Sequence, residues 1–496
     1  MRNAKRTLAA LLASLMLIPA MASCSDAPAE STDTTAADTT AAAETEPRET
    51  ERHEIKDSLP DNLNFGGKTW SIYVSTVGAN NSFVAGSEEK EGDIVNDAVY
   101  DRNRKVEERL TIKLDPVGSA DSYKDNHTKV SALILAGDQT FDLIMGMQTS
   151  MPQLISQKMF VNAYEMEHLD FEQPWWMNDY MDELALGSDY RYIMVSDFNT
   201  QAISYLRTNF FNKKLYEDLY GNPNDLYQKV LDGKWMIDDM QAMIKGAYKD
   251  LNGDGVADTT DQLGFYCNQL LSTVDAFVYN SDVKFTQRDK DGFIELTMIS
   301  DEAVALAERL NKFFYETGVN TKSGSDAGHL GKFSEGTVLF ITGMLSQATN
   351  LRDMEQDYGY IPFPKINENQ EWYKTLVHDT AQLSCIPVSS DCIDISGAIL
   401  EALSAESYRV VTPAWYESAL KLKYARDDIS SQVIDLMRDT MTTDFIYAYN
   451  FALNNLGQVY RTLCTGNNND YVSLVTSRMP AAEKSLADII KTFKGQ

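Results

Sequence analysis

One stretch of the sequence has the residue types and the spacing of a calcium-binding loop. It runs from Asp250 to Asp261 and reads DLNGDGVADTTD. Calcium prefers about six to eight hard oxygen ligands around a tight turn, and a glycine at the sixth position of the loop permits that turn. Gly255 stands at that position. The residues that offer oxygens are Asp250, Asn252, Asp254, Val256 through its carbonyl, Asp258 and Asp261.

This loop departs from the EF-hand pattern at its last position, where Asp261 stands in place of the usual glutamate, as in dockerin-like loops. The shorter side chain favours binding through one oxygen or weaker binding. The alternative is an acidic turn that binds no metal. We expect Ca²⁺ here in a structural role, holding a surface loop without taking part in a reaction.

Motifs for catalysis are missing from the sequence. It contains neither a Gly-x-Ser-x-Gly elbow nor a His-Glu-x-x-His helix. Its five histidines are spread along the chain without the spacing of metal ligands. Acidic residues are abundant, so a pair of glycosidase carboxylates remains open, but no pair stands out from the acidic background. We therefore do not expect an enzyme.

The first 23 residues have the organisation of a signal peptide. Arg2, Lys5 and Arg6 precede an apolar run from Leu8 to Ile18, and this run is too short to span a bilayer. Small residues then lead to Cys24 in the sequence MASC, which is similar to a bacterial lipobox. We expect Cys24 to carry a lipid; the alternative is an ordinary signal peptide followed by a chance cysteine.

The next segment, residues 24–55, consists of Ala, Thr, Ser, Glu, Asp and Pro with almost no large apolar side chain. Such a composition cannot bury a core, so we expect a disordered tether. The full chain has a net charge of -29, and loss of residues 1–23 removes three basic and no acidic residues, which gives -32. This charge argues against a nucleic-acid partner.

The remainder is too long for a single core. Its first part alternates between strands and helices: a strand at Lys68–Val74, a helix capped by Asp93, a strand at 111–117, a helix at Tyr123–Leu135 and a strand at Phe141–Met145. This order predicts a parallel sheet. Ligands of such sheets bind outside the carboxyl ends of the strands, so the loops at 75–82 and 147–150 are candidate site loops.

A second α/β unit lies far along the chain, from Gly336 to Lys365. We expect the chain to cross between two lobes near Asp197–Gln201 and again beside this unit, with Val338–Thr342 ending a strand at the crossing. The motif YGYIPFP would then return as a strand of the first lobe, and Leu383–Val388 would form a further crossing strand. The rest of the chain is expected to be mostly helical.

Two features have both a structural and a functional interpretation. Trp175 and Trp176 follow Pro174, and they either pack in a core or offer a platform for a sugar ring. Adjacent residues of an extended segment point in opposite directions, so one ring would be buried and the other presented. Besides Cys24 there are four cysteines; Cys385 and Cys392 could pair, but we favour free, buried thiols.

The chain from about Leu63 resembles extracellular solute-binding proteins of family 1, the carbohydrate receptors of ABC importers, and most of all their clostridial lipoprotein subgroup. The motifs that carry the resemblance are GDIVNDAVYDRNRKVEERL, FDLIMG, QPWW, the calcium-like loop, YGYIPFPK and VVTPAWYESALKLKYARDDIS. The resemblance implies a two-lobed periplasmic-binding-protein-like fold of type II, which closes on its ligand. It also implies a monomer, anchored at the extracellular face of the membrane, that delivers a carbohydrate to a permease.

This fold assigns the segments of the chain to lobes. We expect the signal peptide at 1–23, the tether at 24–55, lobe 1 at 56–200 plus 344–386 and lobe 2 at 201–343 plus 387–496. Placement on the fold also suggests which residues face the cleft: Thr76, Gln148, Trp176, Gln201, Ser346, Asp379, Trp415 and Tyr416. Trp415 and Tyr416 would lie in the distal lobe.

Three classes of function thus follow from the sequence. The first is a lipid-anchored receptor for a carbohydrate. Such a protein would be stabilised by its ligand and would not convert the ligand into a product. The second is a surface hydrolase of polysaccharides, which would release product. The third is a scaffold or adhesion protein, but a dockerin would need two calcium loops close together and the sequence has one.

Overall fold

The computed structural model describes residues 52–75, 82–87, 89–119, 121, 123–268, 271–323, 326–421 and 428–494, which belong to one compact unit. The signal sequence, Cys24 and Thr76 lie outside these residues, as does the tether up to residue 51. The last tether residues contact the body, since the Arg52 guanidinium lies 4.6 Å from the Tyr408 ring centroid. In the described part of the chain, no helix combines the length and the apolar character needed to cross a bilayer.

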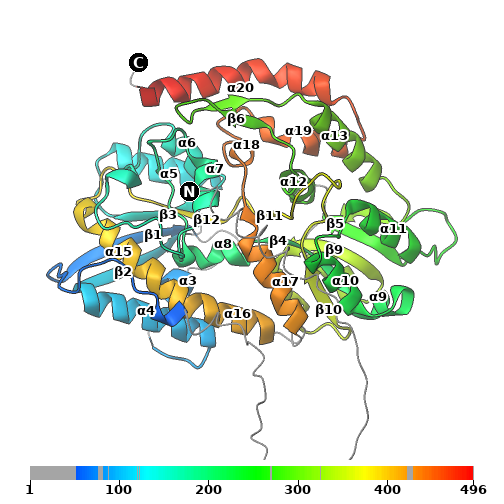
Figure 1. Ribbon diagram of the computed structural model, residues 1–496, viewed down its shortest axis with the longest axis horizontal. Coiled ribbons are helices and arrows are strands. Elements are labelled where there is room, and N and C mark those ends of the chain that lie inside the picture. The colour runs from blue at the N-terminus through cyan, green and yellow to red at the C-terminus, as the bar shows by residue number, and fades with distance from the viewer. Residues whose placement is uncertain are drawn as a thin grey trace, which may run out of the picture. The chain divides into compact units, whose positions relative to one another are not determined.

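The first lobe is built on a four-stranded sheet with the order β12-β3-β1-β2 (Figure 1). Its strands are β1 (Lys68–Ser75), β2 (Ile112–Ser119), β3 (Leu143–Met147) and β12 (Gln382–Cys385). β1 pairs in parallel with both β2 and β3, whereas β12 runs antiparallel to β3. The crossovers are α4 (Ile94–Leu110) and α5 (Tyr123–Leu135), which confirms the predicted strand and helix order.

Local signals explain why α4 forms where the sequence predicts it. The Asp93 side chain accepts hydrogen bonds from the backbone N–H groups of Val95 and Asn96, which have no partner within the helix. Val99 and Val106 lie on one side of the helix and are buried, and Val106 is part of the apolar core. The helix ends at Thr111, whose left-handed backbone turns the chain into β2.

The second lobe is built on a five-stranded sheet with the order β10-β4-β9-β5-β8. Its strands are β4 (Arg207–Asn212), β5 (Leu263–Asn268), β8 (Val319–Ser323), β9 (Val338–Met344) and β10 (Tyr358–Ile361). β9 is central and almost entirely buried, as its apolar sequence predicts. The chain enters this lobe through η2 (Asp197–Asn199) and α8 (Thr200–Ser204), at the place predicted for the first crossing.

The predicted fate of the YGYIPFP motif is wrong. β10 pairs with β4 in the second sheet, so the chain stays in the second lobe after β9 and returns to the first sheet only at β12. Packing explains this choice of partner: the rings of Tyr358 and Tyr360 lie against Phe210 of β4, with centroids 5.9 and 5.4 Å away. Such pairing depends on residues about 150 positions earlier in the chain, beyond the reach of a local pattern.

The helix after β12 also departs from the predicted division. α15 (Ile393–Glu406) packs against α4, so it belongs with the first lobe. Ser396 on α15 accepts a buried hydrogen bond of 2.9 Å from the Trp70 indole of β1. The segment 387–406 is therefore part of lobe 1, and the predicted start of lobe 2 at residue 387 is wrong.

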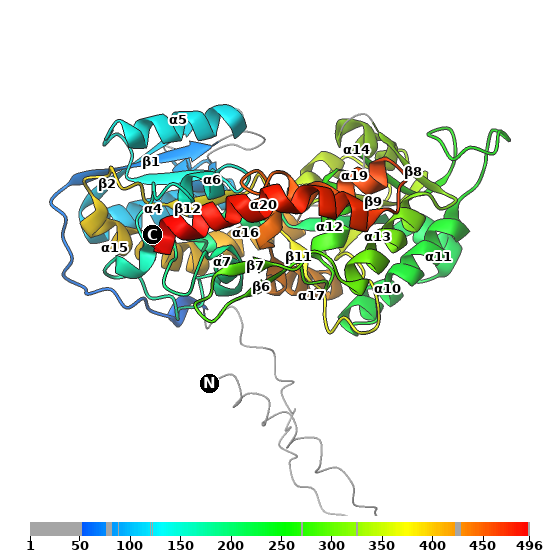
Figure 2. The ribbon, with the colours of Figure 1, turned by 90° about the horizontal axis from the view of Figure 1, so that it is seen from above.

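The remaining elements surround the two sheets (Figures 1 and 2). Helices near the first sheet or the crossings are α3 (Ser82–Ala85), α6 (Met151–Ile155), η1 (Ala163–Glu165), α7 (Asn178–Leu184), η4 (Ser407–Val411) and α16 (Thr412–Lys421). Those with the second sheet are α9 (Lys213–Tyr220), α10 (Pro223–Leu231), α11 (Ile237–Ala247), α12 (Ser272–Tyr279), α13 (Asp301–Phe314), α14 (Asp326–Ser334), η3 (Leu345–Leu351) and α17 (Asp428–Asp439). Two small sheets join β6 (Thr286–Arg288) to β7 (Ile294–Leu296) and β11 (Thr375–Leu376) to β13 (Met441–Thr442).

The C-terminal part is helical, as predicted. It contains α18 (Phe445–Ala448), η5 (Leu456–Gln458), α19 (Val459–Thr465) and α20 (Tyr471–Lys494). α19 packs against α12 and α13 of the second lobe. Figure 2 shows α20 lying across both lobes.

The placement of β10 can be tested at Gly359. A Cβ built there would clash with the Tyr227 hydroxyl and the Phe211 ring of the second lobe. We expect Gly359→Ala to lower the free energy of unfolding by roughly 1–3 kcal/mol, because the packed rings must move. Urea unfolding measures this. The matched control is Gly331→Ala on α14, where a Cβ would meet nothing within 4 Å; equal stabilities of the two variants would contradict the placement.

Candidate functional site

A cavity of about 600 Å³ opens at the carboxyl end of β3. One side is formed by Thr149, which follows β3, and by Asp379 and Thr380, which precede β12. The other side comes from the C-terminal helical part. Its lining residues are Tyr447, Asn450, Phe451, Asn455, Gly457, Gln458, Arg461 and Arg478. The position at the strand ends is where ligands of open α/β sheets bind.

A buried ion pair supports this cavity. The Arg461 Nε lies 2.7 and 2.8 Å from the two carboxylate oxygens of Asp275 on α12, and Arg461 Nη2 also donates to Asp275. The same Nη2 lies 3.9 Å from Asp379 Oδ2. Asp275 is 1% exposed, so its charge is solvated by Arg461 in place of water. The arginine therefore joins α12, α19 and the segment before β12.

Asp379 is held in place by its backbone while its carboxylate stays accessible. Its N–H donates to the Tyr447 hydroxyl at 3.0 Å, and its carbonyl accepts from the Thr149 N–H at 2.9 Å. Its side chain is 26% exposed, with His378 Nδ1 3.2 Å from Oδ1. A fixed carboxylate of this kind can accept hydrogen bonds from two hydroxyl groups of a ligand.

The opposite wall offers complementary groups. Phe451 exposes 37% of its surface and Asn450 is buried, with its Oδ1 lacking a hydrogen-bond partner. An unpaired buried acceptor is costly unless a ligand donor or water reaches it. An aromatic ring beside amide, hydroxyl and carboxylate groups matches the C–H faces and hydroxyls of a sugar.

Several predicted residues lie near the cavity or in the crossings. Asp379 lines it, and Gln148 is the fully buried neighbour of Thr149, where its Oε1 accepts from Tyr180 and Thr443. Gln201 is buried on α8, and its Oε1 accepts from the Gln382 N–H at 3.2 Å. Ser346 is half-buried in η3. Of these four, the cavity wall contains Asp379 alone.

The tryptophan pair is buried, so the expectation of one presented ring is wrong. Trp175 and Trp176 are 0% and 5% exposed, and their indole N–H groups donate to the two oxygens of Glu401 at 3.1 and 3.0 Å. The Asp170 N–H donates to the same carboxyl at 3.2 Å. Burial raises the pKa of Glu401 to about 7, although these hydrogen bonds favour its ionised form.

Trp415 and Tyr416 do not lie in the distal lobe. They are on α16, which packs against α4 of the first lobe, and neither lines the cavity. The two rings contact each other with centroids 5.4 Å apart. Tyr416 is partly buried against the apolar core, and burial raises the pKa of its hydroxyl.

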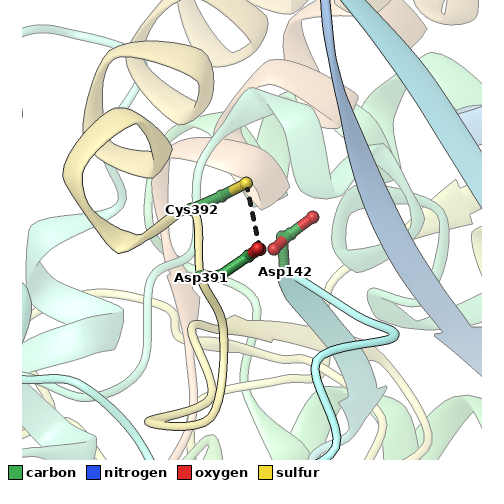
Figure 3. Close-up of side chains that lie close together, drawn as sticks. All are labelled: Asp142, Asp391 and Cys392. Carbon is green, nitrogen blue, oxygen red and sulfur yellow. Dashed lines mark hydrogen bonds between the residues drawn. The ribbon is translucent and has the colours of Figure 1, made fainter.

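The four cysteines of the body are free and buried, as predicted. Cys392 lies beside Asp142 and Asp391, and their ligand atoms all fall within 4.8 Å of one another (Figure 3). However, the Asp142 oxygens already accept from the Ser71 N–H and the Ser390 hydroxyl. Burial, with the two carboxylates, raises the pKa of the Cys392 thiol to about 12, so it stays protonated and is a poor metal ligand.

In the predicted calcium loop, the chain turns tightly around Asp250. Asp250 accepts from the N–H groups of Gly253 and Gly255 at 2.6 and 2.9 Å, and both glycines have positive φ angles. Within the described residues, Asp142, Asp391 and Cys392 are the sole set of three His, Cys, Asp or Glu residues whose ligand atoms all lie within 4.8 Å of one another. The loop carboxylates are therefore further apart, and an ion would have to draw them inward.

Sequence reasoning missed the wall formed by the C-terminal part. Its residues come from the segment 447–461 and from Arg478 on α20. One signal was present: the stretch YNFALNNLGQ, Tyr449 to Gln458, mixes aromatic and amide side chains within a region read as ordinary helix.

Comparisons with known proteins agree with the architecture. No protein-family model matches the chain, and no curated protein matches it. Among solved structures, the chain is similar to the maltose-maltodextrin binding protein of the thermoacidophilic bacterium Alicyclobacillus acidocaldarius. The TM-score is 0.51 at 10% sequence identity, and the match covers 85% of this chain and 100% of that one. The chain thus has the two-lobed periplasmic-binding-protein fold.

The buried Glu401 predicts a pH dependence of stability. Its pKa in the folded state, about 7, lies above the usual 4.5, so the folded state holds a proton that the unfolded state releases. Stability should therefore fall as pH rises from about 5 to 7, with a slope of at most about 1.4 kcal/mol per pH unit. Glu401→Gln should remove this slope in urea unfolding, and Glu108→Gln, at an exposed position of α4, should keep it. Parallel curves for all three proteins would contradict the assignment.

Proposed function

We propose that this protein is an extracellular solute-binding protein that captures a carbohydrate, in the size range of an oligosaccharide, and delivers it to an ABC importer. The observation that carries the proposal is the polar cavity between the lobes, where the accessible carboxylate of Asp379 faces amide groups and the exposed ring of Phe451. The two-lobed fold supports it, because such lobes close on ligands between them. The chemistry of the wall suits hydroxyl groups.

The composition of the cavity favours binding over hydrolysis. A glycosidase ordinarily needs two carboxyl groups that flank the scissile bond, roughly 5–10 Å apart. Among the described residues that line the cavity, Asp379 is the single acidic one. Its neighbours Arg461 and Arg478 are cations. A surface hydrolase is therefore the second candidate and lacks a partner carboxylate here.

We also propose that a lipid on Cys24 anchors the protein to the outer face of the cell membrane, where the chain acts as a monomer. The lipobox-like MASC and the polar segment that follows support this arrangement. Metabolic labelling with a fatty acid, followed by Cys24→Ser, tests it: label should depend on Cys24.

The loop from Asp250 to Asp261 is proposed to bind Ca²⁺ as a structural clip. Asp250 accepts hydrogen bonds from the N–H groups of two glycines, and this forms a tight turn of the kind that a calcium loop requires. Asp250, Asn252, Asp254, Asp258 and Asp261 would supply side-chain oxygens, and Val256 its carbonyl. The loop joins α11 to β5 of the second lobe and is largely exposed, so calcium would hold the surface of that lobe.

Ligand binding is tested with Asp379. Thermal-shift screening of the purified protein against a panel of malto-, cello-, xylo- and manno-oligosaccharides should find stabilising sugars without released product. For any such sugar, Asp379→Asn should weaken binding by roughly tenfold to a hundredfold, because a charge-assisted hydrogen bond is lost. Asp115→Asn, an exposed acid on β2, is the control.

Two results would count against this proposal. Release of shortened sugars would show an enzyme, and equal affinities of the wild type and Asp379→Asn would place the ligand elsewhere.

Calcium binding is tested by melting. If 1 mM calcium exceeds the dissociation constant about a hundredfold, the folded state gains about 2.7 kcal/mol, because the ion binds only that state. The melting temperature should therefore rise between EDTA and calcium in the wild type and not in Asp250→Asn. Asp218→Asn, an exposed acid on α9, should respond like the wild type. The same melting temperature with and without calcium would refute the site.

A further inference from the structure

The two lobes meet at a second place, separate from the segments where the chain crosses between them. There, α20 and the β6–β7 hairpin of the second lobe lie against residues 182–192 of the first lobe (Figure 2). Residues 182–192 are tied to the first lobe by Asn162, which donates to the Asp189 carbonyl and accepts from the Arg191 N–H. This contact is not a chain crossing; besides side chains it includes a backbone hydrogen bond of 3.1 Å from the Ser188 N–H to the Asp291 carbonyl of the hairpin.

The helix α20 is attached to a different lobe at each end. At its start, the Tyr471 hydroxyl donates to the Met298 carbonyl at 2.7 Å, and the Tyr471 ring lies 5.0 Å from that of Tyr460. At its end, the Phe493 ring lies 5.4 Å from the rings of both Tyr190 and Tyr192. The Tyr190 hydroxyl also donates to the Phe493 carbonyl at 3.1 Å.

The hairpin completes the same contact. Phe293, beside β7, lies 6.3 Å from Tyr190 and beneath Lys494, whose Nζ is 4.3 Å from its ring centroid. Arg288 donates to the carbonyls of Ala185 and Asp182 at 2.8 and 2.6 Å. Phe293 and Phe493 are 6% and 4% exposed, so two aromatic side chains of the second lobe are buried by docking on the first.

A proline divides α20 between these attachments. Pro480 lies inside the helix and cannot donate the hydrogen bond that would join it to the preceding turn. Arg478, two residues earlier, lines the cavity and donates to the Asn455 carbonyl at 2.8 Å. The half before Pro480 thus belongs to the cavity wall, and the half after it reaches the first lobe.

We propose that the C-terminal half of α20, with the β6–β7 hairpin, is a latch that holds the lobes together over the cavity and must undock before they separate. The inference rests on the proposed function in one respect, since it makes the latch a control on ligand release. Moving residues 182–192 away from the second lobe would expose Phe293 and Phe493 and leave the carbonyls of Asp182 and Ala185 without their Arg288 partner. These losses favour the closed arrangement.

The latch is tested by an interlobe distance that needs no ligand. Spin labels are placed at Lys113→Cys on β2 and Glu217→Cys on α9, both exposed, in the full chain with Cys24→Ser; the remaining cysteines are buried. Double electron–electron resonance then gives the distance distribution. Phe493→Ala should raise the ratio of the longer-distance to the shorter-distance population roughly tenfold, because the ring contacts of the closed state are lost.

Two further variants make the outcome decisive. Val472→Ala, at an exposed position on the lobe-2 half of α20, should match the wild type. Arg288→Ala removes the hydrogen bonds from the hairpin to the carbonyls of Ala185 and Asp182 without changing α20, and should shift the distribution in the same direction as Phe493→Ala. If both variants give the wild-type distribution, the latch is refuted; if Phe493→Ala unfolds, Arg288→Ala alone decides.

The role in release has its own measurement. For a sugar found by the thermal-shift panel, Phe493→Ala should speed dissociation in stopped-flow chase experiments, and an unchanged rate would overturn control of release. Should no sugar bind, the proposed function fails while the distance measurement still decides whether the latch exists.

Discussion

The ion pair between Arg461 and the buried carboxylate of Asp275 is the constraint on which the rest of the site depends. Arg461 is shared between Asp275 of α12 and Asp379 before β12, so one guanidinium links the second lobe, the C-terminal helices and the strand that re-enters the first sheet. A buried charge without its partner costs several kcal/mol, about 3–5 when one member of a pair is removed. The three segments are therefore held together beside the cavity, and the Asp379 side chain remains 26% exposed.

The proposed binding role starts from this ion pair. The lobes are joined by crossing segments at α8 and before β12, and the second of these lines the cavity together with Phe451, Asn450 and Arg478. A single accessible carboxylate among amides and an aromatic ring can hold hydroxyl groups, but it does not supply the acid and base pair of a glycosidase. The bridge formed by α20 adds a second link between the lobes, so closure depends on more than the hinge. The two links have one property in common. In each, polar or aromatic groups of one lobe have their partners in the other lobe, and they would lose those partners if the lobes separated.

The sequence predicted what local patterns determine. The order β1, α4, β2, α5, β3 followed from alternation, helical spacing and the Asp93 cap, and the first crossing followed from the change of pattern near Asp197. Features set by distant partners escaped it. β10 pairs with β4, whose residues lie about 150 positions earlier. The buried tryptophan pair donates to Glu401, which is 225 positions away from Trp176. Asp379 was found because it precedes a crossing strand, whereas Asn450 and Phe451 lie in the turn between α18 and η5, whose position no periodicity predicts.

The central claim is that the ligand binds between the lobes, on Asp379 and the wall from Tyr447 to Arg461. Amide hydrogen exchange, followed by mass spectrometry with and without a saturating mixture of the oligosaccharide panel, tests it most directly. Protection is predicted in the segments 148–150, 379–381 and 447–461, because closure shields both sides of the cavity at once. Protection confined to one lobe, or to the separate hollow formed by residues 174–180 and 438–441, would contradict the claim.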